Sequence, residues 1–295
     1  NRMAKNKRKF FKENYIFLTD STWRKIPLLR LATLTFILVA TNMLVTGPDS
    51  FPRIDTFQVA TAPIPQTSIA RVPNVSAAAA IIYDPKSAVV LYEKNADSLI
   101  PPASTTKIVT ALVALSNYKM QDVFRVNNID IDGQKMRLVN GEEITVEGLL
   151  NGLLIFSANS AAEVLANNYP GGKEGFVDQM NMIAQALNLT NTHFKNPSGL
   201  FEDGHESSAR DLARLAAFAI ENPVLAEVVK TRDRTVVSTN GANIHKLTNL
   251  NQLLWDTPGV IGIKTGNTEE GGEALVTFVE REEKALAIVV LGSTD

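Results

Sequence analysis

The sequence predicts a mixed α/β (α+β) fold in which strands from both ends of the folded body form one antiparallel sheet. Two observations predict it. Apolar runs bounded by turn residues lie near the start of the body and again at its end. The chain between them carries patterns typical of helices, and no internal repeat interrupts this order. At 45% hydrophobic and 20% charged residues, the composition is that of an ordinary globular protein.

The body is expected to begin with one β-hairpin and to end with another. Residues 84–87 (Asp-Pro-Lys-Ser) favour a tight turn, and apolar segments flank them on both sides. The charged residues 281–283 separate the last two apolar segments in the same way. A further strand is expected to run into the Asn240-Gly241 turn. The expected strands are 77–83, 88–93, 234–238, 273–280 and 284–292.

The segment 104–117 is expected to be a helix in the interior of the domain. It is apolar on nearly all sides after its first turn, which is typical of a helix surrounded by other elements. Two further helices are expected to meet at Ser157. The remaining expected helices are 146–156, 158–168, 173–188, 207–221 and 223–230.

The first 74 residues differ from the body. Residues 1–25 are basic, and an apolar run follows at 26–46. The long basic flank favours an uncleaved transmembrane anchor over a cleaved signal peptide, and the best small-x-small site, residues 60–62, precedes a proline. Residues 47–74 are proline-rich and predict a linker to the catalytic body at 75–295. Both alternatives place that body on the extracytoplasmic side of the cell membrane, periplasmic or extracellular, because the basic flank stays on the cytoplasmic side.

Composition excludes several chemistries. The chain has no cysteine, which rules out a thiolate nucleophile, a disulfide and a cysteine-based zinc site. Beyond its basic start the chain is acidic, which argues against nucleic-acid binding. No metal or other cofactor is expected, since the three histidines form no close ligand pair. Those histidines, His193, His205 and His245, are expected to be surface or packing residues, with His205 solvated in a loop.

Two other places carry residues that are often functional. Trp255 follows two leucines and is expected to be a core residue in preference to a substrate platform. Arg210 and Asp211 are either a pair at a helix start or part of the rim of a site. The sequence leaves that choice open.

Three short segments predict serine-based acyl transfer. They are Ser104-Thr-Thr-Lys107, Ser157-Ala-Asn159 and Lys264-Thr-Gly266, and they match the S-x-x-K, S-x-N and K-T-G set of penicillin-interacting serine enzymes. The first two patterns are each expected about once by chance in such a chain. The chain does contain a second S-x-x-K match at 116–119 and a second S-x-N match at 238–240. The first begins at the end of an expected helix, and the second runs into a turn, so neither is taken as part of the site.

The residue types suit a nucleophile and its base. A serine hydroxyl is a weak nucleophile and needs a neighbouring base. Lys107 lies three residues after Ser104, on the same helix face. Burial and a second cation, Lys264, would both lower the pKa of the Lys107 ammonium and keep part of it neutral. Ser104 is therefore the expected nucleophile and Lys107 the expected general base.

The other motif residues have expected roles around this pair. Ser157 would relay a proton to the leaving amine, and Asn159 would hold Lys107 and a substrate amide. The backbone N–H of Ser104 at its helix start would face the developing oxyanion, with the N–H of Asn267 as second donor. The strand that carries Lys264, Thr265 and Gly266 would bind the terminal carboxylate of the substrate and pair with its backbone.

The flanks of these motifs resemble D-alanyl-D-alanine carboxypeptidases of the low-molecular-mass penicillin-binding type, within the serine β-lactamase/D,D-peptidase superfamily. The resembling segments are 99–112, 154–162, 196–200, 209–213 and 262–266. The resemblance covers residues 75–292 and implies a five-stranded antiparallel sheet against a helical cluster, with the site in the groove between them. It implies removal of the terminal D-alanine of peptidoglycan stem peptides through an acyl-enzyme on Ser104, and covalent inhibition by β-lactams.

The sequence departs from that family in two places. Similar proteins commonly continue past the last strand into a closing helix, and many then carry a small β-rich domain. Ser160 stands where the family usually has an aspartate, with little expected effect on the chemistry.

Two rival functions are weighed against this one. A class A-like β-lactamase needs a carboxylate, within a Glu-x-x-x-Asn pattern, to activate its deacylating water. Glu163 begins a segment that matches this pattern. Glu163 follows Asn159 by only four residues on the same expected helix, so it is expected to be solvated or structural. A non-catalytic β-lactam or wall-binding sensor would have no need of Lys107.

Overall fold

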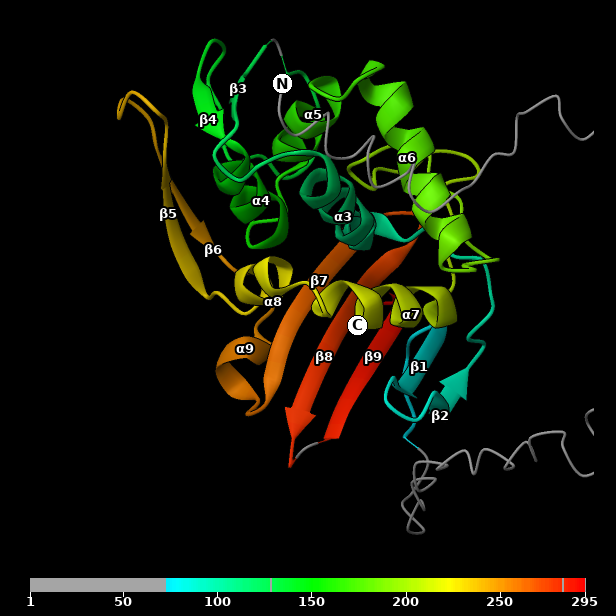
Figure 1. The fold of residues 1–295 in the computed structure, drawn as a ribbon. Coiled ribbons are helices and arrows are strands. Elements are labelled where there is room, and N and C mark those ends of the chain that lie inside the picture. Colours follow the sequence, from blue (N-terminus) through cyan, green and yellow to red (C-terminus); the bar gives the residue numbers. More distant parts are fainter. Residues whose placement is uncertain (1–72, 128, 283, 295) are drawn as a thin grey trace, which may run out of the picture. The chain divides into compact units, whose positions relative to one another are not determined.

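The computed structural model describes residues 73–127, 129–282 and 284–294 (Figure 1). The predicted basic segment, the predicted anchor at 26–46 and nearly all of the predicted linker lie outside these residues. Within the described ranges, no helix has the length and apolar character needed to cross a membrane.

Five antiparallel strands form the main sheet, in the order β2-β1-β9-β8-β7. The first strand pairs with the last, with Ala79 opposite Leu291. The prediction of one antiparallel sheet built from both ends of the body is therefore confirmed. The strands are β1 (Ala79–Asp84), β2 (Val89–Lys94), β7 (Val260–Thr268), β8 (Gly272–Arg281) and β9 (Lys284–Ser293).

Two helices lie across one face of this sheet (Figure 1). Helix α7 (Ala209–Ile220) packs on β1, β8 and β9, and α8 (Pro223–Val229) packs on β7. Helix α7 suits this position because its buried residues recur at three- and four-residue spacing, which forms one apolar face. Its N-cap is Ser208, whose hydroxyl accepts from the N–H of Asp211.

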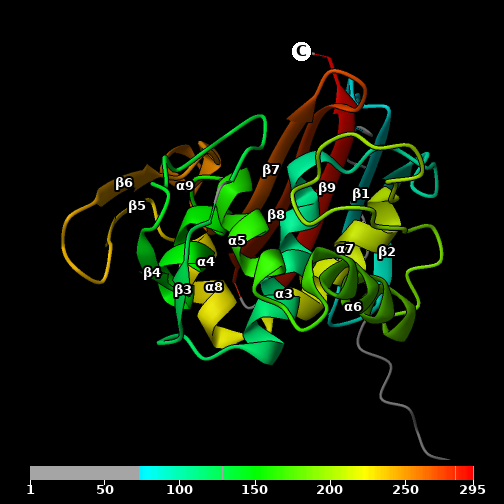
Figure 2. The same ribbon diagram turned by 90° about the horizontal axis from the view of Figure 1, so that it is seen from above.

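The remaining helices form a cluster around α3 (Lys107–Asn117), as Figure 2 shows from above. Residues 107–114 of α3 are all buried, which confirms the prediction of an interior helix. Its neighbours are α4, α5, α6 and α7. The first three are α4 (Val146–Leu154), α5 (Asn159–Asn167) and α6 (Gly172–Ala186).

The predicted helix 104–117 begins differently from the expectation. Its first turn is a separate 3-10 helix, η2 (Ala103–Thr106). Ala103 has a φ of 49°, and Pro102 before it has no N–H to donate. The backbone therefore enters the helix through a tight, irregular turn, and this turn carries Ser104.

Two small hairpins lie beside the helical cluster. The strand predicted at 234–238 is β5 (Asp233–Val237), which pairs with β6 (Ile244–Thr248) through the Asn240-Gly241 turn. The second pair, β3 (Val123–Arg125) with β4 (Glu143–Thr145), was not predicted. Its strands are only three residues long, too short for a recognisable alternation.

The prediction for Trp255 was wrong. This residue lies in the one-turn helix α9 (Leu253–Asp256), and its side chain is 40% exposed. The guanidinium of Arg232 lies 5.8 Å from the centroid of its ring, at the distance of a cation–π contact. The short helix turns only Leu254 into the core.

Candidate active site

The turn η2 brings Ser104 and Lys107 together. Lys107 Nζ lies 2.8 Å from Ser104 Oγ, within hydrogen-bond distance. Side chains three residues apart eclipse one another in a 3-10 turn, which accounts for this contact. Lys107 is completely buried, whereas Ser104 is half-buried and reaches solvent. The two residues of the predicted pair thus lie in contact, with the serine accessible and the lysine enclosed.

Both lysines of the site have lowered pKa values. Burial lowers the pKa of Lys107 well below its ordinary value, and the charge of Lys264 lowers it further. Burial alone lowers the pKa of Lys264 to about 7. The lowered pKa raises the neutral fraction of the Lys107 amine, which is the form that can accept a proton.

Strand β7 lies directly against the nucleophile turn. A Cβ at Gly266 would lie 3.0 Å from the backbone nitrogen of Ser104, so a side chain there would push the two backbones apart by a few tenths of an ångström. Gly199 approaches from the opposite chain segment, and a Cβ there would overlap the carbonyl oxygen of Ala103. Two glycines thereby enclose the turn that carries Ser104.

Ser157 lies between α4 and α5, in the left-handed backbone region with a φ of 60°. Such a conformation is uncommon for a residue with a side chain and is typical of functional turns. The residue is 3% exposed and lines a groove together with Thr265, Gly266 and Asn267. Gln134, residues 250–253, Glu273 and Leu275 complete the groove wall. The structure therefore brings the S-x-N and K-T-G motifs to one cavity.

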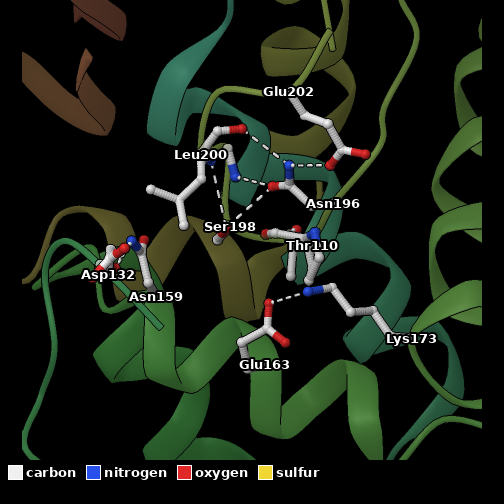
Figure 3. Close-up of polar contacts among 11 residues, drawn as sticks. Thr110, Asp132, Asn159, Glu163, Lys173, Asn196, Ser198, Leu200 and Glu202 are labelled. Atoms are coloured by element: carbon white, nitrogen blue, oxygen red, sulfur yellow. Dashed lines mark hydrogen bonds and ion pairs between the residues drawn. The ribbon is translucent and has the colours of Figure 1, made fainter. Parts of the chain in front are cut away.

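Asn159 has a different partner from the one predicted. Its Nδ2 donates to the carbonyl of Asp132 at 2.7 Å (Figure 3). Its backbone N–H donates to the carbonyl of Gln134 at 2.7 Å. Among the described residues, Lys107 donates to the backbone carbonyl of Ser198 and to Ser104, and no hydrogen bond joins it to Asn159. Asn159 thus anchors the groove wall through Asp132 and Gln134, and its predicted role toward Lys107 stays a prediction.

The loop 196–200 contributes a contact to Lys107 that was not predicted from the sequence. Asn196 Oδ1 accepts from the Gly199 N–H at 2.8 Å, and its Nδ2 donates to the Leu200 carbonyl at 3.0 Å (Figure 3). Thr110 Oγ1 donates to the Pro197 carbonyl at 2.7 Å. These bonds hold the Ser198 carbonyl against the Lys107 amine. The segment Asn-Pro-Ser-Gly-Leu resembles the family and so pointed to this loop, but the resemblance indicated no role for its residues.

The prediction that His205 is solvated in a loop was wrong. The ring is 3% exposed, and its Nδ1 accepts from the Lys195 N–H at 3.2 Å. Nε2 therefore carries the proton and donates to Thr106 Oγ1 at 2.8 Å. Burial, His193 and Lys107 together lower the pKa of His205 to about 4, so the ring is neutral near pH 7. The two hydrogen bonds of His205 therefore connect the turn that carries Ser104 with the chain at Lys195.

Glu163 and the Arg210-Asp211 pair lie outside this groove. Glu163 is 8% exposed and forms an ion pair with Lys173 at 2.8 Å (Figure 3), in line with a structural role. Arg210 pairs with Asp97 at 2.7 Å, and Asp211 accepts from the Asn191 N–H at 2.7 Å. Both residues lie in the first turn of α7, and neither is among the residues that line the groove.

A family model described as "D-alanyl-D-alanine carboxypeptidase" matches residues 66–295. A Bacillus subtilis D-alanyl-D-alanine carboxypeptidase, DacF, is 35% identical over 225 residues, which are 74% of this chain and 58% of that protein. A Pseudomonas aeruginosa D-alanyl-D-alanine endopeptidase is 33% identical over 238 residues, covering 79% of this chain and 76% of that protein. The chain thus spans less than two thirds of DacF.

Solved structures show the same architecture. The Streptomyces K15 DD-transpeptidase matches with a TM-score of 0.72 at 32% identity, covering 77% of this chain and 93% of that one. A Mycobacterium tuberculosis D-alanyl-D-alanine carboxypeptidase matches with a TM-score of 0.73 at 32% identity, covering 77% and 86%. The fold is therefore shared with a DD-transpeptidase and with a D-alanyl-D-alanine carboxypeptidase.

Proposed function

Because the chain belongs to the D-alanyl-D-alanine carboxypeptidase family, we propose that it is a serine D,D-carboxypeptidase acting on peptidoglycan stem peptides. It would remove the terminal D-alanine, and β-lactams would inhibit it covalently. The observation that carries the proposal is the contact of 2.8 Å between the buried Lys107 amine, whose pKa is lowered, and the accessible Ser104 hydroxyl. This is the arrangement that an activated serine nucleophile requires.

Acylation begins with proton transfer from Ser104 Oγ to Lys107 Nζ. The oxygen attacks the carbonyl carbon of the penultimate D-alanine and forms a tetrahedral intermediate. The backbone N–H groups of Ser104 and Asn267 would stabilise its oxyanion, since Gly266 brings the two backbones together. A general base of this kind contributes about 10²–10⁴-fold to the rate.

The intermediate then collapses and the C–N bond breaks. Ser157 would pass the proton from Lys107 to the leaving amine, which departs as D-alanine. Water subsequently attacks the Ser104 ester, with Lys107 again accepting a proton, and releases the shortened peptide. The position of Ser157 in the same groove as Thr265 supports this role.

Lys264 and Thr265 would bind the terminal carboxylate of the substrate. Lys264 is 2% exposed, and its Nζ donates to the Thr265 carbonyl at 2.8 Å. With a pKa of about 7, part of this amine is charged at neutral pH, and an arriving carboxylate would favour the charged form. The charge that would bind substrate also adds to the effect of burial in lowering the pKa of Lys107.

The experiment is covalent labelling of the full chain with a fluorescent penicillin. The wild-type protein should become labelled, and Ser104→Ala should not. Labelling of Ser104→Ala, or an unlabelled wild-type protein that is folded by circular dichroism, would refute the proposal. Hydrolysis of the label over minutes would favour the β-lactamase alternative.

The predicted membrane anchor at 26–46 remains part of the proposal. Its support is the sequence pattern of a basic flank followed by an apolar run. The catalytic body would then lie on the side of the membrane where peptidoglycan is found. Expression of the full chain in a bacterium, followed by carbonate extraction of membranes, tests this: an anchored protein stays in the pellet, whereas a cleaved one is released.

A further inference from the structure

The left-handed turn at Ser157 is supported from one side by the segment 132–136. Asn159 donates two hydrogen bonds of 2.7 Å to backbone carbonyls of this segment, one from its side chain and one from its backbone. Ser160 accepts a third, from the Met136 N–H at 3.3 Å. These bonds all reach the first two residues of α5, so the segment holds the chain directly after Ser157.

Met136 connects this segment to the helical cluster and to a hairpin. Its side chain is buried against α4, where a Cβ on Gly152 would overlap the Met136 sulfur. Gly152 in turn accepts a hydrogen bond of 2.9 Å from the Ala158 N–H, directly after Ser157. On the other side, the Met136 carbonyl faces His245 Nδ1 of β6 at 2.8 Å. Met136 therefore lies between the Ser157 turn and the β5–β6 hairpin.

The ring of His245 is held by two partners. A backbone carbonyl can only accept, so Nδ1 donates its hydrogen to Met136. Nε2 lies 2.6 Å from Glu142 Oε1, and these two atoms share one proton. The second carboxylate oxygen accepts from the Val139 N–H at 2.9 Å. The side chains of His245 and Glu142 are only 5% and 0% exposed, so a bond lost there leaves a buried polar group without a partner.

The His245–Glu142 pair braces two walls of the catalytic groove and lies outside it. Gln134, in the segment that Met136 ends, lines the groove, and so do residues 250–253, which follow β6. Neither member of the pair lines the groove. The strand with the K-T-G residues is β7, which belongs to the main sheet. A change at His245 is therefore expected to move the wall beside the Ser157 turn and to leave β7 in place.

We propose that His245, oriented by Glu142, is a positioning residue that keeps the Ser157 hydroxyl at the departing amine. It would act through the Met136 carbonyl, which holds the segment 132–136 against the start of α5. This inference rests on the proposed function, because the role of Ser157 in proton transfer is taken from there.

Two substitutions of His245 separate its two hydrogen bonds. The amide of His245→Asn ends near the position of Nδ1, so it can donate to Met136 but cannot reach Glu142. The longer side chain of His245→Gln ends near the position of Nε2, so it can donate to Glu142 but cannot reach Met136. The first variant therefore keeps the bond that the proposal requires, and the second keeps the partner of the buried carboxylate.

The two variants should rank in opposite orders for stability and for rate. His245→Asn should melt at the lower temperature, because it leaves the buried Glu142 carboxylate without its partner. It should nevertheless be acylated by penicillin faster than His245→Gln, whose rate constant should fall by about 10–10²-fold through misplacement of Ser157. If the less stable variant is also the slower one, His245 has only a structural role and the proposal fails.

Steady-state kinetics on a D-Ala-D-Ala peptide give a second readout. His245→Gln should lower kcat and kcat/KM equally, because the contact of Ser157 with the departing amine is made only in the transition state. KM should stay as in wild type, since β7 is unchanged. A raised KM with an unchanged kcat would show that His245 supports substrate binding instead, against the proposal.

A double-mutant cycle tests whether His245 acts through Ser157. Once Ser157→Ala has removed the hydroxyl, nothing remains for His245 to position. His245→Gln should therefore slow acylation by less than about twofold in that background, with adduct formation followed by mass spectrometry over hours. Equal slowing in the presence and absence of the Ser157 hydroxyl would overturn the proposal.

Ile81→Ala is the matched control for lost stability. Ile81 is 1% exposed in β1 of the main sheet, so its truncation should lower the melting temperature and leave the acylation rate as in wild type. A control as slow as His245→Gln would attribute the slowing to lost stability and overturn the proposal. A wild-type protein that labels with penicillin but slows equally in both backgrounds would refute this inference alone. A wild-type protein that does not label would refute the proposed function, and this inference with it.

Discussion

His205 and Thr106 are joined by a hydrogen bond of 2.8 Å between a neutral, buried imidazole and the hydroxyl next to Lys107. The two residues are 99 positions apart in the chain. Their contact links the nucleophile turn to the loop that presents the Ser198 carbonyl to the lysine. The geometry of the proposed nucleophile and base therefore depends on a side chain that touches neither of them.

Substitution of His205 should change the acid stability of the protein. The pKa of this imidazole is about 4 when folded and about 6.5 when unfolded, so below pH 6.5 the unfolded chain binds more protons. Stability is fully present above that pH and is lost as the pH falls toward 4, by roughly 3 kcal/mol. Urea unfolding of wild type and His205→Gln between pH 4 and 7 measures this. His205→Gln should show a smaller change, and an equal change in both would contradict the prediction.

Replacement of Lys107 should abolish most acylation. Lys107→Ala removes the proposed base, and the rate constant for penicillin acylation should fall by about 10²–10⁴-fold. Lys107→Arg should be equally slow, because a guanidinium keeps its charge and cannot accept the proton. Stopped-flow labelling measures both. A full rate in either variant would place the base elsewhere.

The pH dependence of kcat/KM for a D-Ala-D-Ala peptide should be bell-shaped. The acidic limb reflects protonation of Lys107, whose pKa lies well below its ordinary value. The alkaline limb should lie near pH 7, because Lys264 has a pKa of about 7 and loses the charge that binds the carboxylate. Lys264→Arg keeps that charge, so it should move the alkaline limb to higher pH. An alkaline limb unchanged in Lys264→Arg would assign it to another group.

Gly199→Ala should impair both stability and acylation. Gly199 has a φ of 83°, and an added Cβ would overlap the carbonyl of Ala103. Gly241→Ala is the matched control, with a φ of 74° and nothing within 4 Å of the new Cβ. The control should lose about 1 kcal/mol from backbone strain, and Gly199→Ala should lose more and label more slowly. Equal losses in thermal melts, with equal labelling rates, would exclude the steric explanation.

Glu163→Gln should leave penicillin turnover unchanged. Its carboxylate is bound to Lys173 and does not line the groove, so it is unavailable to a deacylating water. The ion pair is partly exposed at Lys173, and its loss should cost about 0–1 kcal/mol. The decay of the penicillin adduct, followed by mass spectrometry, measures deacylation. A slower decay in Glu163→Gln would revive the β-lactamase alternative.

Local spacing in the sequence was enough to predict that the proposed nucleophile and its proposed base lie in contact. Ser104 and Lys107 are three residues apart, and a separation that short fixes their contact once the segment is helical. Apolar runs likewise predicted β1 and β9 and the interior position of α3. A strand or helix that is buried on one side, or on all sides, has a recognisable pattern of apolar residues along its sequence. The order of the three motifs along the chain identified the family resemblance.

The partners of these residues were decided by tertiary structure alone. No pattern in the sequence indicated that Lys107 contacts Ser198, that Asn159 contacts Asp132, or that His205 contacts Thr106. Each contact joins segments brought together by long-range packing, and a hydrogen bond of this kind leaves no periodicity in either segment. The sequence by itself therefore determined which residues could do the chemistry. Only the folded structure decided which neighbours hold them in position, because burial and loop contacts depend on the whole chain.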